Sequence, residues 1–201
     1  MLDYHQLAER LRNYPRQTIP TENLRPAAVL LPLFERDGKA SLLFTIRTEH
    51  LEHHSGEISF PGGASDATDA DFIDTACRET EEEIGVHRDS IEILGRMDDF
   101  YSIHGYHVVP VVGIIPPPET LQIEAAEISA VFEAPVEFFR DPKVHHVEDW
   151  KHQGRVHPVD FYRYGTHVIW GLTAAMLRQF LAITEPSSAD GFLPIKQSHG
   201  Y

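Results

Sequence analysis

Four glutamates stand close together in the segment "ACRETEEEIGV", residues 76–86. They are Glu79, Glu81, Glu82 and Glu83, and on a helix their charges repel at spacings of three and four residues. At about 100° per residue, Glu79, Glu82 and Glu83 share one face, whereas Glu81 points nearly the opposite way. Three carboxylates on one face are oxygen ligands suited to Mg²⁺ or Mn²⁺. The cluster predicts a divalent metal site, and the alternative interpretation is a solvent-exposed acidic face.

A short motif, "SFPGG" at residues 59–63, precedes this segment. Gly62 and Gly63 lack side chains, so backbone groups there can come close to a ligand. A carbonyl could reach a metal ion, and amides could reach a phosphate. An isolated Pro-Gly-Gly is more often a plain tight turn, but here it leads into the glutamate segment, and we expect the two to form one site.

The charge balance limits the partners of this chain. Its 31 acidic and 17 Lys and Arg residues give a net charge of −14. Such a surface should not bind nucleic acid or an anionic membrane by general electrostatics. A phosphate ligand then needs a metal or local positive groups. Arg47 and His54 are the candidate substrate contacts, and packing in a strand or loop is the alternative for each.

The single cysteine and the apolar pattern bear on location. Cys77 cannot form an intrachain disulfide, which fits a reducing cytoplasm. No apolar run reaches the ~18 residues of a membrane span. The start, "MLDYHQLAERLRNYPRQ", lacks the apolar region of a secretory signal. These features predict a cytoplasmic protein.

The remaining patterns predict the elements that position the site. The length of 201 residues and an apolar content of 42% fit one sizeable domain. Leucines predict an amphipathic helix near the N-terminus, and Asp37 and Gly38 predict a hairpin turn between two strands. Asp71 is the expected N-cap of a helix over about 72–84. Further strands are expected over 106–115 and 127–135, and a closing helix over 171–183. The fold class expected is α+β, with a helical segment at 1–24, a domain at 25–184 and a tail at 185–201.

Residues 63–86 resemble the Nudix box, which is Gly, five residues, Glu, seven residues, then Arg-Glu-apolar-x-Glu-Glu-x-Gly-apolar. Gly63 would be the opening glycine and "RETEEEIGV" the closing half. The intervening stretch is one residue longer than the pattern, Asp69 or Asp71 stands for the first glutamate, and Thr80 replaces an apolar residue. Upstream, "LLFTIRTEHLEHHSGEISFPGG" looks like the signature of the coenzyme A diphosphatase branch of Nudix hydrolases, with Glu52 where an arginine is usual.

The resemblance implies a Nudix-type α/β/α sandwich with a mixed central sheet and a metal-dependent diphosphatase. The implied reaction is hydrolysis of coenzyme A to 3′,5′-ADP and 4′-phosphopantetheine. A hydrolase of another nucleoside diphosphate derivative, such as ADP-ribose or NADH, is the alternative within the same chemistry. A ligand sensor of the same fold without turnover is a further alternative.

The resemblance also implies roles for single residues. Glu79 and Glu83 would be the principal ligands of Mg²⁺ or Mn²⁺, and Glu82 a further ligand or the residue that holds the water. A carbonyl near Gly62 or Gly63 would complete the coordination, and Arg78 would orient the glutamates. Glu127 is the first candidate for the general base, followed by Glu124 and His104. The expected partner is a small nucleotide, neither nucleic acid nor membrane, and a homodimer is one option for assembly.

Overall fold

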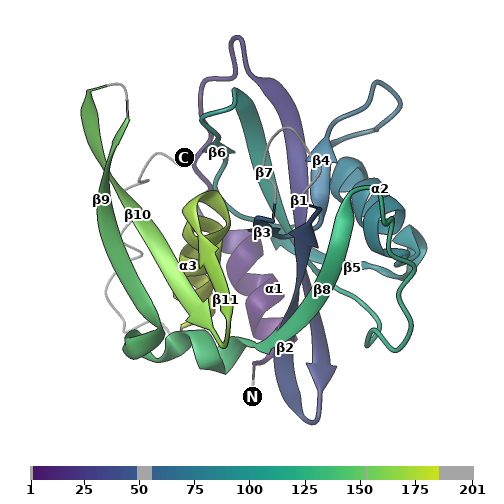
Figure 1. Cartoon of the computed structure of the whole chain (residues 1–201). Helices are drawn as coiled ribbons and strands as arrows, with labels where there is room; N and C mark the ends of the chain where they lie inside the picture. Colours follow the sequence, from purple (N-terminus) through teal and green to yellow (C-terminus); the bar gives the residue numbers. More distant parts are fainter. Residues whose placement is uncertain (1, 49–55, 153, 186–201) are drawn as a thin grey trace.

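The computed structural model describes residues 2–48, 56–152 and 154–185 (Figure 1). Eight strands within these ranges form one sheet: β1 (Arg25–Arg36), β2 (Lys39–Arg47), β3 (Ile58–Ser59), β4 (Gly62–Ala64), β5 (Glu92–Arg96), β6 (Phe100–Tyr101), β7 (Tyr106–Ile114) and β8 (Ile128–Pro135). The order along the sheet is β3-β2-β1-β7-β5. In addition, β4 pairs with β1, β6 with β7, and β8 with β2.

The chain reverses between β1 and β2 at Asp37 and Gly38, whose φ angles are +52° and +72°. Two left-handed residues in succession are typical of a type I′ turn, whose twist matches that of the strands. β1 pairs with β2 antiparallel and with β7 in parallel, so the sheet is mixed. The predicted hairpin, the predicted strand over 106–115 and the predicted mixed sheet are confirmed.

Helix α2 (Phe72–Ile84) has the two ends that the sequence predicts. The Asp71 carboxylate accepts hydrogen bonds from the backbone N–H groups of Ile73 and Asp74. The helix stops at Gly85, where φ is +74° and the N–H donates to the carbonyl of Glu81. An acidic N-cap satisfies free amides of the first turn, and glycine takes the left-handed conformation without strain. The glutamates therefore lie in the last turns of α2.

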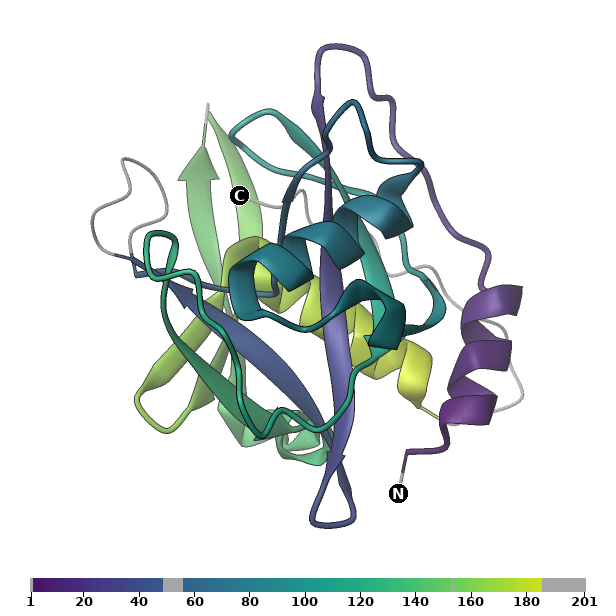
Figure 2. The same cartoon turned by 90° about the vertical axis from the view of Figure 1, so that its right-hand side faces the viewer.

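The sheet is the middle layer of a sandwich. Because side chains alternate along a strand, Leu30 and Phe34 of β1 point to α2, where they are buried in a cluster with Ile84 (Figure 2). Leu31 and Leu33 point to the other face, which is covered by α1 (Tyr4–Asn13) and α3 (Gly171–Thr184). The α+β class and the α/β/α sandwich are thereby confirmed.

The N-terminal helix α1 packs on this core. Its Leu7 and Leu11 are buried, as its amphipathic pattern predicts. Past the helix, the backbone N–H of Gln17 donates to the buried carboxylate of Asp98 at 2.7 Å, and Gln179 of α3 donates to the same carboxylate at 2.6 Å. The N-terminal segment therefore shares the core of the sheet. No helix in the described ranges is both long and apolar enough to cross a membrane.

A second sheet was not anticipated from the sequence. Its three strands, β9 (His145–His152), β10 (Arg155–Tyr164) and β11 (His167–Trp170), form antiparallel pairs (Figure 1). Three short 3₁₀ helices, Arg88–Ser90, Val136–Arg140 and Pro142–Val144, complete the elements described. β11 lies against β3 and runs directly into α3, so this sheet borders the glycine motif. Strand β9 was not predicted because its sequence, "HHVEDWKH", is mostly polar and lacks the alternation of apolar residues typical of a strand.

The pairing of β2 with β8 contains a β-bulge. Ile46 lies opposite Ala130 and Arg47 lies opposite Ile128, so Ser129 is the extra residue. The Ser129 hydroxyl donates to the carbonyl of Ile46 at 3.0 Å, which fixes the bulge. Bulges bend a strand and re-aim the side chains beyond them, and this one lies where Arg47 approaches α2.

Candidate active site

The carboxylates of Glu79 and Glu83 meet the glycine strand β4. The backbone N–H of Gly62 donates to Oε2 of Glu83 at 3.1 Å. A Cβ added to Gly63 would lie 2.5 Å from Oε2 of Glu79, so only glycine permits this approach. Residues four apart on a helix share a face, which places both glutamates on the side of α2 that faces β4. The two motifs singled out in the sequence thus come together.

Burial controls the ionisation of both glutamates. The side chain of Glu83 is 4% exposed, and burial raises its pKa to about 8 against the opposing effects of the Gly62 N–H and of Arg47. Burial also raises the pKa of Glu79, whereas the hydrogen bond from Arg78 lowers it. The negative charge of Glu79 adds to the increase at Glu83. A cation bound between them would favour the ionised form of both.

Arg78 holds this part of α2 against the loop before it. Its Nε and Nη2 donate to the two carboxylate oxygens of Asp69 at 2.8 and 2.9 Å, and Nη2 also donates to the Ala64 carbonyl. Its Nη1 donates to Oε1 of Glu79 at 2.8 Å. The hydrogen bonds from Arg78 hold the pKa of Asp69 well below its usual range. Of the two acids left open by the sequence, Asp69 therefore binds the arginine, and Asp71 caps the helix.

Glu82 and Glu81 lie away from the glycine strand. Glu82 is 58% exposed and accepts from Nη1 of Arg78 at 2.9 Å, so it stands at the outer edge of the glutamate face. Glu81 accepts from Nε of Arg88 at 2.9 Å. Glu81 therefore points away from the face of Glu79 and Glu83, as predicted, and its carboxylate pairs with the basic side chain of Arg88.

Arg47 connects the glutamates to the end of β2. Its Nη1 lies 3.6 Å from Oε1 of Glu83, and its Nη2 lies 3.9 Å from Oε2 of Glu127. Glu127 immediately precedes β8 and its side chain is half-exposed. Its negative charge contributes to the raised pKa of both Glu79 and Glu83. The described structure therefore brings Glu127 close to both candidate ligands and leaves it open to solvent.

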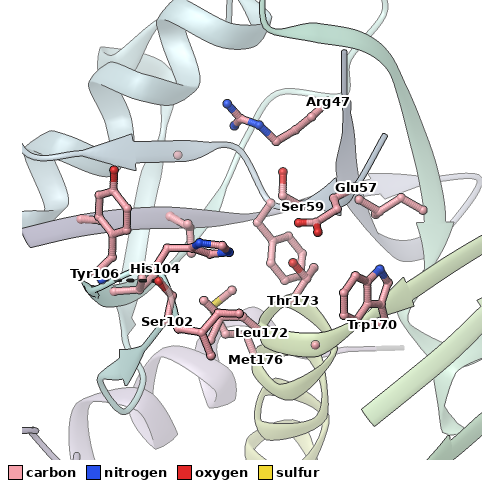
Figure 3. Close-up of a pocket in the computed structure, with 18 of the residues that line it drawn as sticks. Arg47, Glu57, Ser59, Ser102, His104, Tyr106, Trp170, Leu172, Thr173 and Met176 are labelled. Carbon is pink, nitrogen blue, oxygen red and sulfur yellow. Dashed lines mark hydrogen bonds between the residues drawn. The ribbon is translucent and has the colours of Figure 1, made fainter. Parts of the chain in front are cut away.

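The other two candidates for the base lie differently. The Glu124 carboxylate accepts from the N–H of Ala126 at 3.1 Å, within its own loop, while its backbone N–H donates to the Glu83 carbonyl. His104 lines a cavity that Arg47 also lines (Figure 3). Neither side chain has a described contact with Glu79 or Glu83, in contrast to the charge interaction of Glu127.

The cavity that adjoins the glutamates has a volume of about 380 Å³. Arg47 and Gly62, which both contact Glu83 of α2, line the cavity. Trp170 of the second sheet and Leu172 and Met176 of α3 line the wall on the side away from Arg47 (Figure 3). Apolar and aromatic side chains dominate that wall: Trp150, Trp170, Leu172 and Met176. Ile103, from the loop between β6 and β7, also lines the cavity. Hydroxyl groups of Ser59, Ser102 and Thr173 are interspersed. A mostly apolar cavity with a few polar groups is typical of a small-molecule site.

Comparison with known proteins assigns the chain to a family. The NUDIX domain model matches residues 23–164. The chain belongs to the Nudix family. A Nudix hydrolase named NudL from Photorhabdus laumondii is 40% identical over 79% of this chain and 84% of its own length. NudL of Escherichia coli is 39% identical over 82% of this chain and 85% of its own length. A Nudix hydrolase structure from Alicyclobacillus acidocaldarius shares the fold, with a TM-score of 0.51, 17% identity and coverage of 79% and 91% of the two chains.

The Nudix site offers oxygen ligands of the kind that these hydrolases use, since they generally depend on divalent metal ions. In the described ranges, no three His, Cys, Asp or Glu side chains form a ready ligand group. The partly buried Glu79 and the buried Glu83 nevertheless both meet β4, and Glu79 packs over a glycine that leaves room for its carboxylate. Carboxylates with water completing the shell suit Mg²⁺ or Mn²⁺, so the residues present fit such an ion.

The predicted site residues of this Nudix hydrolase fall into three groups. Six of them converge in the described structure: Arg47, Gly62, Gly63, Arg78, Glu79 and Glu83. Glu82 and Glu127 lie at the rim, and His54 lies outside the described residues. The cavity wall left no signal in the sequence, because Trp150 and Trp170 lie 64 and 84 residues beyond Val86, where the box ends. The isolated Trp150 within the polar segment "HHVEDWKH" could have indicated this wall.

Proposed function

We propose that this Nudix hydrolase cleaves the diphosphate linkage of coenzyme A, giving 3′,5′-ADP and 4′-phosphopantetheine, with Mg²⁺ or Mn²⁺ as cofactor. One observation carries the proposal. Arg47 belongs to the segment 42–63 that resembles the coenzyme A diphosphatase signature, and it lies 3.6 Å from Glu83 while lining the cavity. Arg47 therefore connects the described part of this segment to the glutamates and to the cavity, which supports the proposal.

The chemistry follows from the positions of the charged groups. Glu79 and Glu83 would hold the metal ion, which neutralises charge on the diphosphate when bound. Arg78, fixed by Asp69, keeps Glu79 in place, and such charge-assisted bonds are strong and directional. Arg47 is positioned to contact a phosphate oxygen on the cavity side.

Glu127 is the proposed general base. It takes a proton from the attacking water, whose oxygen forms a bond to one phosphorus while the bond from that phosphorus to the bridging oxygen breaks. The bridging oxygen leaves with the other phosphate, so the two products are phosphate monoesters. The exposed position of Glu127 next to Arg47 supports this role because the water can reach it.

A substrate panel tests the proposal. The purified chain is incubated with coenzyme A, ADP-ribose or NADH, with and without Mg²⁺ or Mn²⁺, and the products are separated by chromatography. We expect coenzyme A to be cleaved to the two named products only when metal is present. Intact coenzyme A beside a cleaved ADP-ribose or NADH would favour the alternative hydrolase. Binding of these compounds without turnover of any would favour the sensor.

A further inference from the structure

The cavity has an aromatic end that the proposed chemistry does not use. Trp150 of β9 and Trp170 at the end of β11 both line it, with ring centroids 5.3 Å apart and planes at 38°. Phe161 of β10 stacks on Trp170 at an interplanar angle of 11° and supports it from behind. The residue Trp150 is 38% exposed. This supported indole surface is suited to stacking with a flat heterocycle such as a nucleobase.

Two cationic side chains lie on different sides of the same cavity. Among its described lining residues, Arg47 and Lys151 are those of the Lys and Arg type. Arg47 comes from β2 and contacts Glu83, whereas Lys151 follows Trp150 on β9 of the second sheet. In a chain of net charge −14, a lysine beside the indole rings is a positive side chain suited to an anionic group. The described lining of the cavity also includes one carboxylate, that of Glu57.

We infer that Lys151 binds the 3′-phosphate of the substrate's ribose while the adenine stacks on Trp170, with Trp150 beside it. This inference rests on the proposed function and adds to it the reason for selecting coenzyme A. The diphosphate lies toward Arg47 and the glutamates, and the additional phosphate monoester lies at the opposite, aromatic end. ADP-ribose and NADH carry no phosphate at that position. Lys151 is therefore a specificity-determining residue for the ribose phosphate.

The test compares coenzyme A with dephospho-coenzyme A, which lacks only the 3′-phosphate. kcat and KM are measured for both substrates with the intact chain, with Lys151→Gln and with the matched control Lys143→Gln, whose exposed lysine does not line the cavity. A lost charged contact corresponds to about a tenfold change. We expect Lys151→Gln to raise KM for coenzyme A about tenfold, with kcat and both constants for dephospho-coenzyme A unchanged, and Lys143→Gln to resemble the unmodified chain.

A second variant tests the aromatic surface. Trp170→Leu should raise KM for both substrates by the same factor, because both contain adenine. An unchanged ratio of kcat/KM for the two substrates in Lys151→Gln, with coenzyme A still cleaved, would overturn the inference alone. If the unmodified chain does not cleave coenzyme A, the proposed function fails, and the inference fails with it. A Trp170→Leu effect on only one substrate would contradict the stacking.

Discussion

The carboxylate of Asp69 receives two hydrogen bonds of nearly equal length from the guanidinium of Arg78, 2.8 Å from Nε and 2.9 Å from Nη2. The same guanidinium donates to Glu79. Asp69→Asn should therefore weaken the attachment of α2 to its preceding loop. We expect the free energy of unfolding at pH 7 to fall by about 1.5–3 kcal/mol, the usual contribution of a hydrogen bond to a charged group. Urea titration followed by circular dichroism measures it.

The acid dependence of stability should change in the same variant. Because Arg78 holds the pKa of Asp69 below the ~3.9 of an unfolded aspartate, its contribution is complete above that pH and is lost as pH falls toward the folded-state pKa. In Asp69→Asn, the free energy of unfolding should therefore depend less on pH below about pH 4. Asp71→Asn is the control, since asparagine is also a good N-cap. Equal losses of stability in the two variants would contradict the assigned roles.

The two glycines of β4 should fail in different ways when replaced by alanine. A Cβ at Gly62 would lie 2.3 Å from the carbonyl oxygen of Ala28 at a φ of +153°, so Gly62→Ala should destabilise the fold. The three atoms nearest to a Cβ at Gly63 all belong to the movable carboxylate of Glu79. Gly63→Ala should fold normally but lose about a hundredfold in kcat/KM, as expected for a displacement of about 1 Å. Thermal melting and turnover assays separate the outcomes, and full activity of folded Gly63→Ala would refute the placement of Glu79.

Divalent metal should stabilise the chain through Glu83. Ligand at a hundred times its Kd adds about 2.7 kcal/mol to the stability of the folded state. We expect Mg²⁺ or Mn²⁺ to raise the melting temperature of the unmodified chain and of Glu81→Gln, whose carboxylate pairs with Arg88. Glu83→Gln should show no such rise and no turnover. A metal-induced rise of equal size in Glu83→Gln would exclude Glu83 as a ligand.

Removal of the proposed base should slow the chemical step. Glu127→Gln should lower kcat by about 10²- to 10⁴-fold, the range for general base catalysis, with little change in KM. Glu124→Gln, from the same loop, should retain kcat because its carboxylate accepts from Ala126. Steady-state kinetics at saturating metal measure both. If Glu124→Gln loses more activity than Glu127→Gln, the order of the two candidates is reversed.

Local signals were sufficient for the elements that hold the glutamates. Asp71 and Gly85 marked the two ends of α2 because capping depends on neighbouring residues only. The turn at Asp37 and Gly38 is similarly local. The sequence left Asp69 and Asp71 open because the stretch from Gly63 to Arg78 is one residue longer than the pattern, and the loop conformation is what brings Asp69 to Arg78.

The cavity required the tertiary structure. Its wall combines the ends of β2, β9 and β11 with the start of α3, and contacts between such distant segments leave no periodic pattern in the sequence. The strand β9 reads as a charged loop because its polar side chains are solvated. Arg47, which lies 3.6 Å from Glu83, stands next to the bulge in β8, and no pattern in the sequence indicates this bulge.

The extra residue Ser129 has a bearing on how this enzyme could vary. The ladder continues past the bulge, where the N–H of Thr48 donates to the carbonyl of Glu127 at 2.9 Å. A shift of one residue in strand pairing turns a side chain to the other face of a sheet. Insertion or deletion of a single residue at Ser129 would therefore exchange the side chain presented beside Arg47, and it would also turn the neighbouring buried Ile128 away from the core. The presence of Ser129 as an extra residue thus determines which side chain of this strand lies beside Arg47.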